Sequence, residues 1–136
     1  GHYKQLAEKE AIEATFIVKL EDKTNVTDTD MCIILGNLLE NAYEACERQK
    51  EGKRYMSANI RQNGGTLVII VENSYEGTVR RQEGVFLSSK EKMRKGIGIT
   101  SVIDVTKKYN GIPKFEYDGR RFRVSLLLGS RSESAI

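Results

Sequence analysis

Apolar residues recur along the chain in short runs and at alternate positions, which is the pattern of β-strands. Segments that are rich in β-branched residues, or that alternate between apolar and polar residues, predict buried or half-buried strands. Asn63-Gly64-Gly65 and Asp118-Gly119 each separate two such segments and predict hairpin turns. The strands predicted in this way cover residues 14–20, 55–62, 66–73, 113–117 and 121–128.

Three other segments have the composition or the periodicity of helices. Residues 4–13 are rich in Ala, Glu and Lys, and residues 30–50 have apolar positions at helical spacing, after several candidate N-cap residues. A further helix is predicted over residues 96–109, opening at Gly96-Ile97-Gly98-Ile99 and closed by Asn110-Gly111. Residues 74–95 are polar and basic, without sustained periodicity, and predict an irregular loop.

The order of these elements favours an α/β two-layer sandwich. A strand and a helix are followed by two strands, a long loop, a helix and two final strands, so a mixed β-sheet would pack on about three helices. The length of 136 residues suits one domain. We expect residues 1–13 to form an N-terminal helix or junction, residues 14–129 the domain itself, and residues 130–136 a frayed tail.

Composition excludes several classes of function. His2 is the single histidine and is interpreted, with Gly1, as the remnant of a tag, so Ser–His or Cys–His catalysis and His-ligated zinc are excluded. Cys32 and Cys46 fall in one predicted helix about 21 Å apart, too far for a disulfide, which favours a reducing, cytoplasmic setting. No segment reaches the roughly 18 apolar residues of a membrane helix, and none resembles a signal peptide.

The helix predicted over residues 30–50 carries a polar stripe beside its apolar face. Asn37, Asn41, Glu44 and Arg48 lie within about 60° of one another at the rim of that face. A solvated flank with a Glu44–Arg48 ion pair is one interpretation. A row of oxygen donors facing a ligand or Mg²⁺ is the other, because Asn is a mediocre helix former and its amide oxygen suits this cation. The apolar face comprises Met31, Ile34, Leu35, Leu38, Leu39, Ala42, Ala45 and Cys46.

A second candidate site lies at the start of the helix predicted over residues 96–109. Gly96 and Gly98 would let the backbone approach phosphate oxygens at a helix N-terminus, although simple turn chemistry also explains such a pair. Residues 78–95 carry six basic and two acidic side chains, whereas the whole chain has a net charge of only +3. This segment is interpreted as a mobile lid over a polyphosphate, or alternatively as a solvated basic loop.

Three short motifs follow one another along the chain: residues 35–46 (LGNLLENAYEAC), 86–90 (FLSSK) and 95–99 (KGIGI). They resemble the N-box, the F-box and the second glycine box of the GHKL superfamily, and the resemblance covers about residues 15–128. It implies the ATP-binding fold, with a mobile ATP lid, that DNA gyrase, the heat-shock chaperone ATPase, mismatch-repair ATPases and sensor histidine kinases share.

The resemblance also implies roles for individual residues. Asn41 would be the Mg²⁺ ligand, and Asn37 would contact the phosphates or the shell of the metal; these two are the candidate catalytic residues. Gyrase and chaperone members carry an acid at the position of Asn37 as general base for hydrolysis, so Asn favours the kinase branch. Gly96 and Gly98 would cradle the phosphates, assisted by Lys95 or Lys90. The residues expected to contact ATP are Asn41, Glu44, Ala45, Asn73, Gly77, Lys90, Lys95, Gly96, Ile97, Gly98 and Ile99.

The first glycine box departs from the family pattern D-x-G-x-G. Asn73 stands where the family has the Asp that accepts from the adenine amino group, Tyr75 stands at the first glycine, and only Gly77 matches. A neutral amide is a weaker acceptor than a carboxylate. Many kinases also have Lys or Arg at the position of Glu44. Together these departures resemble the peptide-pheromone (Agr-type) quorum-sensor kinases of Gram-positive bacteria.

The resemblance therefore implies the catalytic ATP-binding domain of a two-component sensor histidine kinase. It would bind Mg-ATP and transfer the γ-phosphoryl to a histidine on an upstream dimerisation domain absent from this chain, with a response regulator as the next acceptor and little activity in isolation. We expect a cytoplasmic domain, monomeric by itself, of a membrane-anchored homodimer, without contacts of its own to membrane or nucleic acid. The alternatives are a non-catalytic nucleotide-binding or docking module and an anti-sigma-factor-like serine kinase of the same superfamily.

Overall fold

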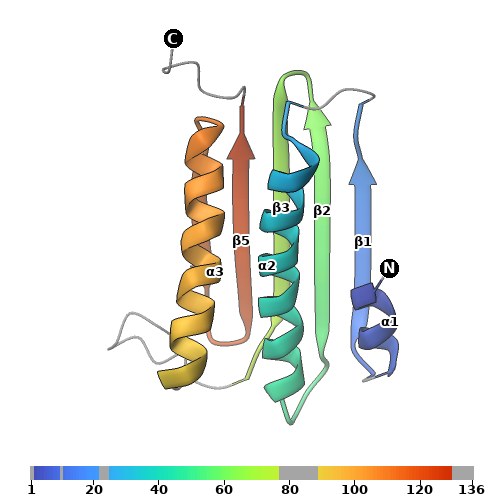
Figure 1. Cartoon of the computed structure of the whole chain (residues 1–136). Helices are drawn as coiled ribbons and strands as arrows, with labels where there is room; N and C mark the ends of the chain where they lie inside the picture. Colours follow the sequence, from blue (N-terminus) through green and yellow to red (C-terminus); the bar gives the residue numbers. More distant parts are fainter. Residues whose placement is uncertain (1, 10, 22–24, 77–88, 130–136) are drawn as a thin grey trace.

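The computed structural model describes residues 2–9, 11–21, 25–76 and 89–129. Figure 1 shows α2 and α3 side by side in front of the sheet, with the short α1 beside its β1 edge. The elements are α1 (His2–Lys9), β1 (Glu13–Lys19), α2 (Asp28–Arg48), β2 (Tyr55–Asn63), β3 (Thr66–Ser74), α3 (Ser89–Lys108), β4 (Ile112–Tyr117) and β5 (Arg121–Leu128).

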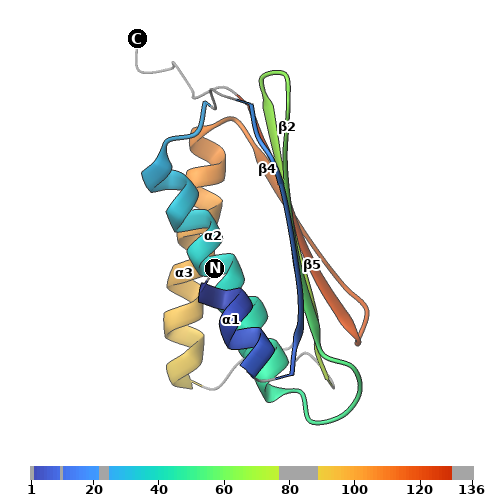
Figure 2. The ribbon, with the colours of Figure 1, turned by 90° about the vertical axis from the view of Figure 1, so that its right-hand side faces the viewer.

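The described strands form one five-stranded sheet in the order β1-β2-β3-β5-β4. β1 runs parallel to β2, and every other neighbouring pair is antiparallel, so the sheet is mixed. Figure 2 shows the described helices together on one face of this sheet. The predicted two-layer α/β sandwich with a mixed sheet on three helices is therefore confirmed.

The core lies between the central strands and α2. Along β2 and β3 every second side chain is buried, because successive residues of a strand point to opposite faces. From α2 the residues Ile34, Leu38, Ala42 and Cys46 are buried, at a spacing of four that brings them onto one face of the helix. The apolar face predicted for the long helix is confirmed, with its central row fully enclosed.

Helix α2 begins and ends two residues earlier than the apolar pattern predicts. Its N-cap is Thr27, whose Oγ1 accepts a hydrogen bond from the Asp30 amide at 3.1 Å and so satisfies one of the first free N–H groups of the helix. At the other end Gln49 adopts an extended conformation and terminates the helix. Helix α1 also ends early, because the chain turns at Ala11, whose φ is 59°.

The start predicted for the second long helix is wrong. Helix α3 begins at Ser89, so Gly96 and Gly98 lie within it rather than at its N-terminus, and the last part of the predicted loop is helical. The physical reason is that Lys, Glu, Met and Arg between positions 90 and 95 are good helix formers. The combined helix propensity of these residues outweighs the cost of roughly 1 kcal/mol for each glycine in a helix.

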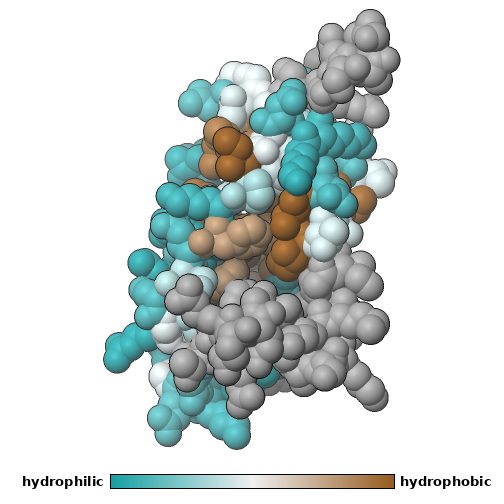
Figure 3. Space-filling model, turned by 90° about the vertical axis from the view of Figure 1, so that its left-hand side faces the viewer, coloured by the Kyte–Doolittle hydropathy of each residue, from teal (hydrophilic) through white to brown (hydrophobic). Residues whose placement is uncertain are grey.

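The surface of the described residues has scattered apolar side chains. Figure 3, which faces the α3 side of the molecule, shows them as separate patches among hydrophilic neighbours. None of the described helices combines the length and the apolar character needed to cross a bilayer. The frayed tail predicted at residues 130–136 lies outside the described residues.

Candidate functional site

Asn37 and Gly98, which belong to different predicted motifs, meet where α2 and α3 lie side by side. A Cβ atom placed on Gly98 would lie 2.7 Å from Asn37 Oδ1 and 3.3 Å from its Cγ. The Asn37 side chain is held in this position because its Nδ2 donates a 2.7 Å hydrogen bond to the carbonyl of Ile33. The structure therefore brings the N-box and the second glycine box together, at a point where only glycine leaves room.

The other polar residues of the α2 stripe continue along the same flank of the helix. Asn41 lies one turn after Asn37, and Asn41, Glu44 and the adjacent Ala45 are half-buried, whereas Arg48 at the end of the stripe is exposed. Half-burial suits residues at the rim of a ligand site. No group of three or more His, Cys, Asp or Glu side chains that could hold a metal occurs among the described residues.

Asn73 occupies the end of β3 on the face that the helices cover. Its side chain is 5% exposed, and it continues the buried row formed by every second residue of this strand. Its Nδ2 donates to the carbonyl of Ser74 at 2.9 Å. This hydrogen bond fixes the orientation of the amide. The role predicted for Asn73 as an acceptor from adenine stays a prediction.

Tyr75, at the position of the first family glycine, joins the end of β3 to the β4–β5 turn. Its phenol oxygen accepts a 2.6 Å hydrogen bond from the Gly119 amide, and its own amide donates to the Arg120 carbonyl at 3.0 Å. Burial raises the pKa of this phenol above its ordinary value. The next residue, Glu76, accepts hydrogen bonds from the amides of Lys50 and Glu51. A residue that departs from the family pattern thus has a structural role that the sequence did not indicate.

A buried polar cluster beneath this region ties the end of α2 to the start of β2. Ser74 Oγ donates to Gln49 Oε1 at 2.7 Å and accepts from the Tyr55 amide at 2.9 Å. Gln49 Nε2 donates in turn to the carbonyls of Glu51 and Lys53. Burial raises the pKa of the neighbouring Cys46 thiol, so it stays protonated. Sequence reasoning missed this cluster, because Ser and Gln have no pattern that distinguishes a buried position from an exposed one.

A second buried network fixes the far end of α3 against the start of α2. Asp30 is 5% exposed, and its Oδ2 accepts from the Tyr109 phenol at 2.6 Å and from Lys108 Nζ at 2.9 Å. The Tyr109 oxygen also accepts from the Thr27 amide. The hydrogen bond from Tyr109, followed by that from Lys108, lowers the pKa of Asp30 despite its burial. These contacts hold the two helices in the relative position that places Gly98 on Asn37.

The remaining predicted contacts lie outside the described part of the chain or at its border. Gly77 and the F-box segment up to residue 88 are outside the described residues. Lys90, Lys95, Gly96 and Ile97 belong to the α3 backbone, but the structure does not describe side chains at these positions, so their contacts stay predictions. Ile99, one residue after Gly98, is half-buried.

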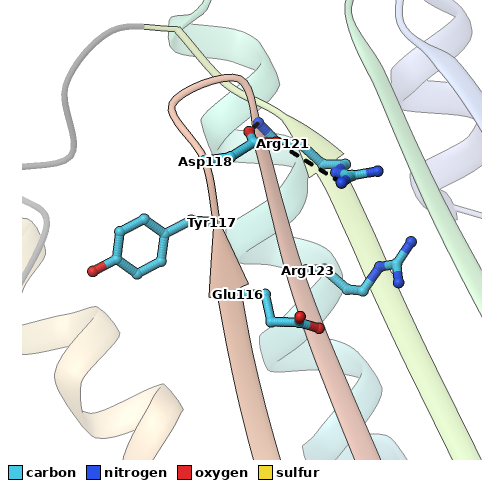
Figure 4. A pocket seen from close by; sticks show the side chains of 5 residues that line it. All are labelled: Glu116, Tyr117, Asp118, Arg121 and Arg123. Carbon is cyan, nitrogen blue, oxygen red and sulfur yellow. Dashed lines mark hydrogen bonds and ion pairs between the residues drawn. The ribbon is translucent and has the colours of Figure 1, made fainter.

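A cavity lies at the tip of the β4–β5 hairpin. It is lined by Glu116, Tyr117, Asp118, Arg121 and Arg123, and it holds charges of both signs (Figure 4). Arg123 Nε donates to Glu72 Oε1 at 2.8 Å, and the Tyr55 phenol donates to the other oxygen of Glu72. Burial and the Glu72 carboxylate raise the pKa of Tyr55 to about 12. Because these charges neutralise one another, the cavity is a poor candidate for an anion site.

Comparison with protein families gives one match that spans most of the chain. A model described as "GHKL domain" matches residues 26–129, which include α2, the whole β2–β5 part of the sheet and α3. No curated protein matches the chain significantly.

Comparison with solved structures finds the same fold in histidine kinases. The catalytic domain of histidine kinase ThkA matches with a TM-score of 0.65 and 16% identity, covering 96% of this chain and 91% of that one. The histidine kinase domain of a blue-light-activated kinase from Erythrobacter litoralis gives 0.72 and 12%, covering 94% and 56%. Full-length ShkA in complex with AMPPNP gives 0.62 and 15%, covering 96% and 29%. At these identities the likeness concerns the fold, which is that of histidine kinase catalytic domains.

Proposed function

The chain belongs to the GHKL domain family, and we propose that it is the catalytic ATP-binding domain of a sensor histidine kinase. The observation that carries this proposal is the contact between Asn37 and Gly98, because it unites the two motifs that would surround the phosphates. A second support is the amide at position 37. An amide cannot act as the general base that activates water, so the nucleotide would be kept for transfer rather than hydrolysis.

We assign the Mg-ATP site to the region where α2 and α3 meet, near the end of β3, because the polar residues of α2 and Asn73 suit this ligand. Asn73 Oδ1 would accept from the adenine amino group, and Asn41 would ligate Mg²⁺. Because Gly96 and Gly98 lie inside α3, they would not offer the free N–H groups of a helix N-terminus, and Gly98 would instead leave the room that the Asn37 side chain needs. A bound nucleotide would supply the γ-phosphoryl group, and Mg²⁺ would neutralise the charge that develops on it. The chain itself would contribute binding and orientation. Asn37 would lie beside the phosphates, and its neutral amide would not take up a proton.

The partners follow from this assignment. The phosphoryl acceptor would be a histidine on an upstream dimerisation domain of the same protein, and a response regulator would accept the group next. We place the domain in the cytoplasm, as part of a membrane-anchored homodimer. The Asn73 and Tyr75 departures support a place among the peptide-pheromone (Agr-type) sensors.

Calorimetric titration of the chain with ATP, with and without Mg²⁺, tests the nucleotide site. We expect Mg²⁺-dependent binding that Asn41→Ala weakens by about tenfold or more, since losing a direct metal ligand costs at least as much as losing an outer-shell partner. Asn59→Ala is the matched control, because Asn59 lies on the opposite face of the sheet, where its Oδ1 accepts from Arg61. A folded wild type that binds no ATP, or equal affinities of wild type and Asn41→Ala, contradicts the proposal.

Incubation of the complete sensor with γ-labelled ATP tests the phosphotransfer. A histidine kinase yields a phosphoryl group that is lost in acid and survives base, and Asn41→Ala should abolish the labelling. An acid-stable product identifies a serine kinase instead. ATP binding without any labelling identifies a non-catalytic docking module.

A further inference from the structure

Three residues on neighbouring strands form one row across the helix-covered face of the sheet. Phe122 of β5 pairs with Asn73 of β3 on one side and with Tyr117 of β4 on the other. Their positions alternate with the outward residues of each strand, so all three side chains point toward the helix layer. Directly paired residues have Cβ atoms about 5 Å apart. Phe122 therefore lies immediately beside Asn73, and Tyr117 continues the row one strand further away.

The rings of Phe122 and Tyr117 stack on each other. Their centroids are 6.2 Å apart and their planes differ by 14°. Phe122 packs against the buried core on one side, and both residues remain half-buried on the face that the helices cover. Figure 4 shows Tyr117 projecting from β4 toward the α3 ribbon, away from the Arg121 and Arg123 side chains. The pair thus presents an aromatic surface next to Asn73.

The hairpin that carries this pair is anchored at its turn. Asp118 Oδ1 accepts from the amides of Arg120 and Arg121, and Gly119 takes a φ of +95°. The Tyr75 phenol accepts from the Gly119 amide, which ties the turn to the end of β3 two residues after Asn73. The aromatic row and the Asn73 amide are consequently held in a constant relative position.

From this geometry we infer that Phe122 and Tyr117 form an aromatic wall of the nucleotide site and contact the base of the bound nucleotide. The inference rests on the proposed ATP site and adds base-contacting residues to it. Stacking on an aromatic ring is available to every nucleobase, so the wall supplies affinity, while the Asn73 oxygen favours a base with an amino group. In this way the wall offsets the weaker hydrogen bond of an amide that stands in place of a carboxylate.

Titration of Phe122→Leu and Tyr117→Leu with Mg-ATP tests the inference, with Tyr117→Phe as the conservative variant. We expect each leucine variant to bind about five- to tenfold more weakly, because leucine keeps apolar contact but removes the stacking surface. Tyr117→Phe should keep the affinity of the wild type. Phe115→Leu is the matched control: Phe115 lies on the same face of β4, packs against the core, and pairs with Val124 one row away from Asn73.

The outcomes separate this inference from the proposed function. Weaker binding by Phe122→Leu and Tyr117→Leu, with Phe115→Leu unchanged, supports the aromatic wall. Wild-type affinity in both variants refutes the wall while ATP binding by the domain still stands, and an equal loss in Phe115→Leu attributes the effect to packing. Thermal melts of each variant check the fold, and Tyr117→Leu decides the question if Phe122→Leu does not fold. A folded wild type that fails to bind ATP refutes the proposed function itself.

Discussion

At Gly98 the requirement for glycine comes from a neighbour on another helix rather than from backbone conformation. The missing side chain leaves the space that Asn37 Oδ1 occupies, 2.7 Å from where a Cβ would be. Gly36, one residue before Asn37, is a contrasting case: it is exposed on α2, and an added Cβ would meet no atom within 4 Å. These two glycines allow the role of close approach to be separated from helix propensity.

We predict that Gly98→Ala weakens Mg-ATP binding without a comparable loss of stability. The new methyl group would displace the Asn37 side chain and break its hydrogen bond to Ile33, whereas alanine itself favours a helix by about 1 kcal/mol over glycine. Calorimetric titration and urea unfolding measure the two effects separately. In the control Gly36→Ala, stability should rise by about 0.5–1 kcal/mol with unchanged affinity. Identical ATP affinities of Gly98→Ala and wild type would show that Asn37 does not depend on this space.

Single residues of the site were predictable from the sequence to different extents. The spacing of Asn37 and Asn41 on a helix predicted that they share one flank, because helical geometry is local. The tie between Tyr75 and the Gly119 amide was not predictable, since the two residues are 44 positions apart and no pattern connects them. From the sequence alone Tyr75 was only a departure from a family motif, whereas in the structure its phenol accepts a hydrogen bond from the Gly119 amide.

At the scale of elements, the start of α2 and the end of α3 are joined by one buried carboxylate. The Tyr109 phenol and Lys108 hold the pKa of Asp30 below its ordinary value of about 3.9. The stability contributed by this carboxylate is therefore fully present above about pH 4 and is lost as pH falls through the lowered folded-state pKa. Helix α3 keeps its place beside α2 through these contacts.

We predict that Asp30→Asn lowers the free energy of unfolding at pH 7 by about 1–3 kcal/mol, the usual cost of losing a charged buried hydrogen-bond partner. The difference between wild type and variant should shrink in acid, because the wild-type carboxyl then becomes neutral as well. Urea unfolding at neutral pH and near pH 3 measures this change. Asp104→Asn, at an exposed position of α3, is the control and should alter stability by no more than about 0.5 kcal/mol. A difference that is equal at both pH values would contradict the role given to Asp30.

The boundaries of elements illustrate where local patterns fail. All the predicted strands occur, since alternation of apolar residues is a direct consequence of one covered sheet face. The start of α3 was misplaced because the two glycines were interpreted as a helix N-terminus, whereas the helix-forming residues before them extend the helix to Ser89. Gly98 consequently approaches α2 from within a helix.

At the scale of the whole molecule, the described helices cover only one face of the sheet. Leu126 and Leu127 are neighbours on β5, yet they are 1% and 51% exposed, because their side chains point to opposite faces. The same substitution at these two positions therefore reports on how each face is covered.

We predict that Leu126→Ala lowers the free energy of unfolding by about 2–5 kcal/mol, as for other buried leucines. Leu127→Ala should cost less than about 1 kcal/mol, since its side chain loses little contact. Chemical unfolding of both variants at equal concentration gives the comparison. A loss at Leu127 as large as that at Leu126 would mean that the outer face is covered in solution.

The sequence by itself determined the secondary structure, the two-layer fold class and the pair of motifs that indicate a nucleotide site. These features depend on residue type, on helical and strand periodicity and on short-range spacing, all of which involve residues close together in the sequence. Only the tertiary structure decided that Gly98 rests against Asn37, that Tyr75 holds the β4–β5 turn, and that Phe122 and then Tyr117 continue the row that begins at Asn73. Such contacts join residues far apart in the sequence. They depend on how the helices and strands pack together, and local sequence patterns do not predict that packing.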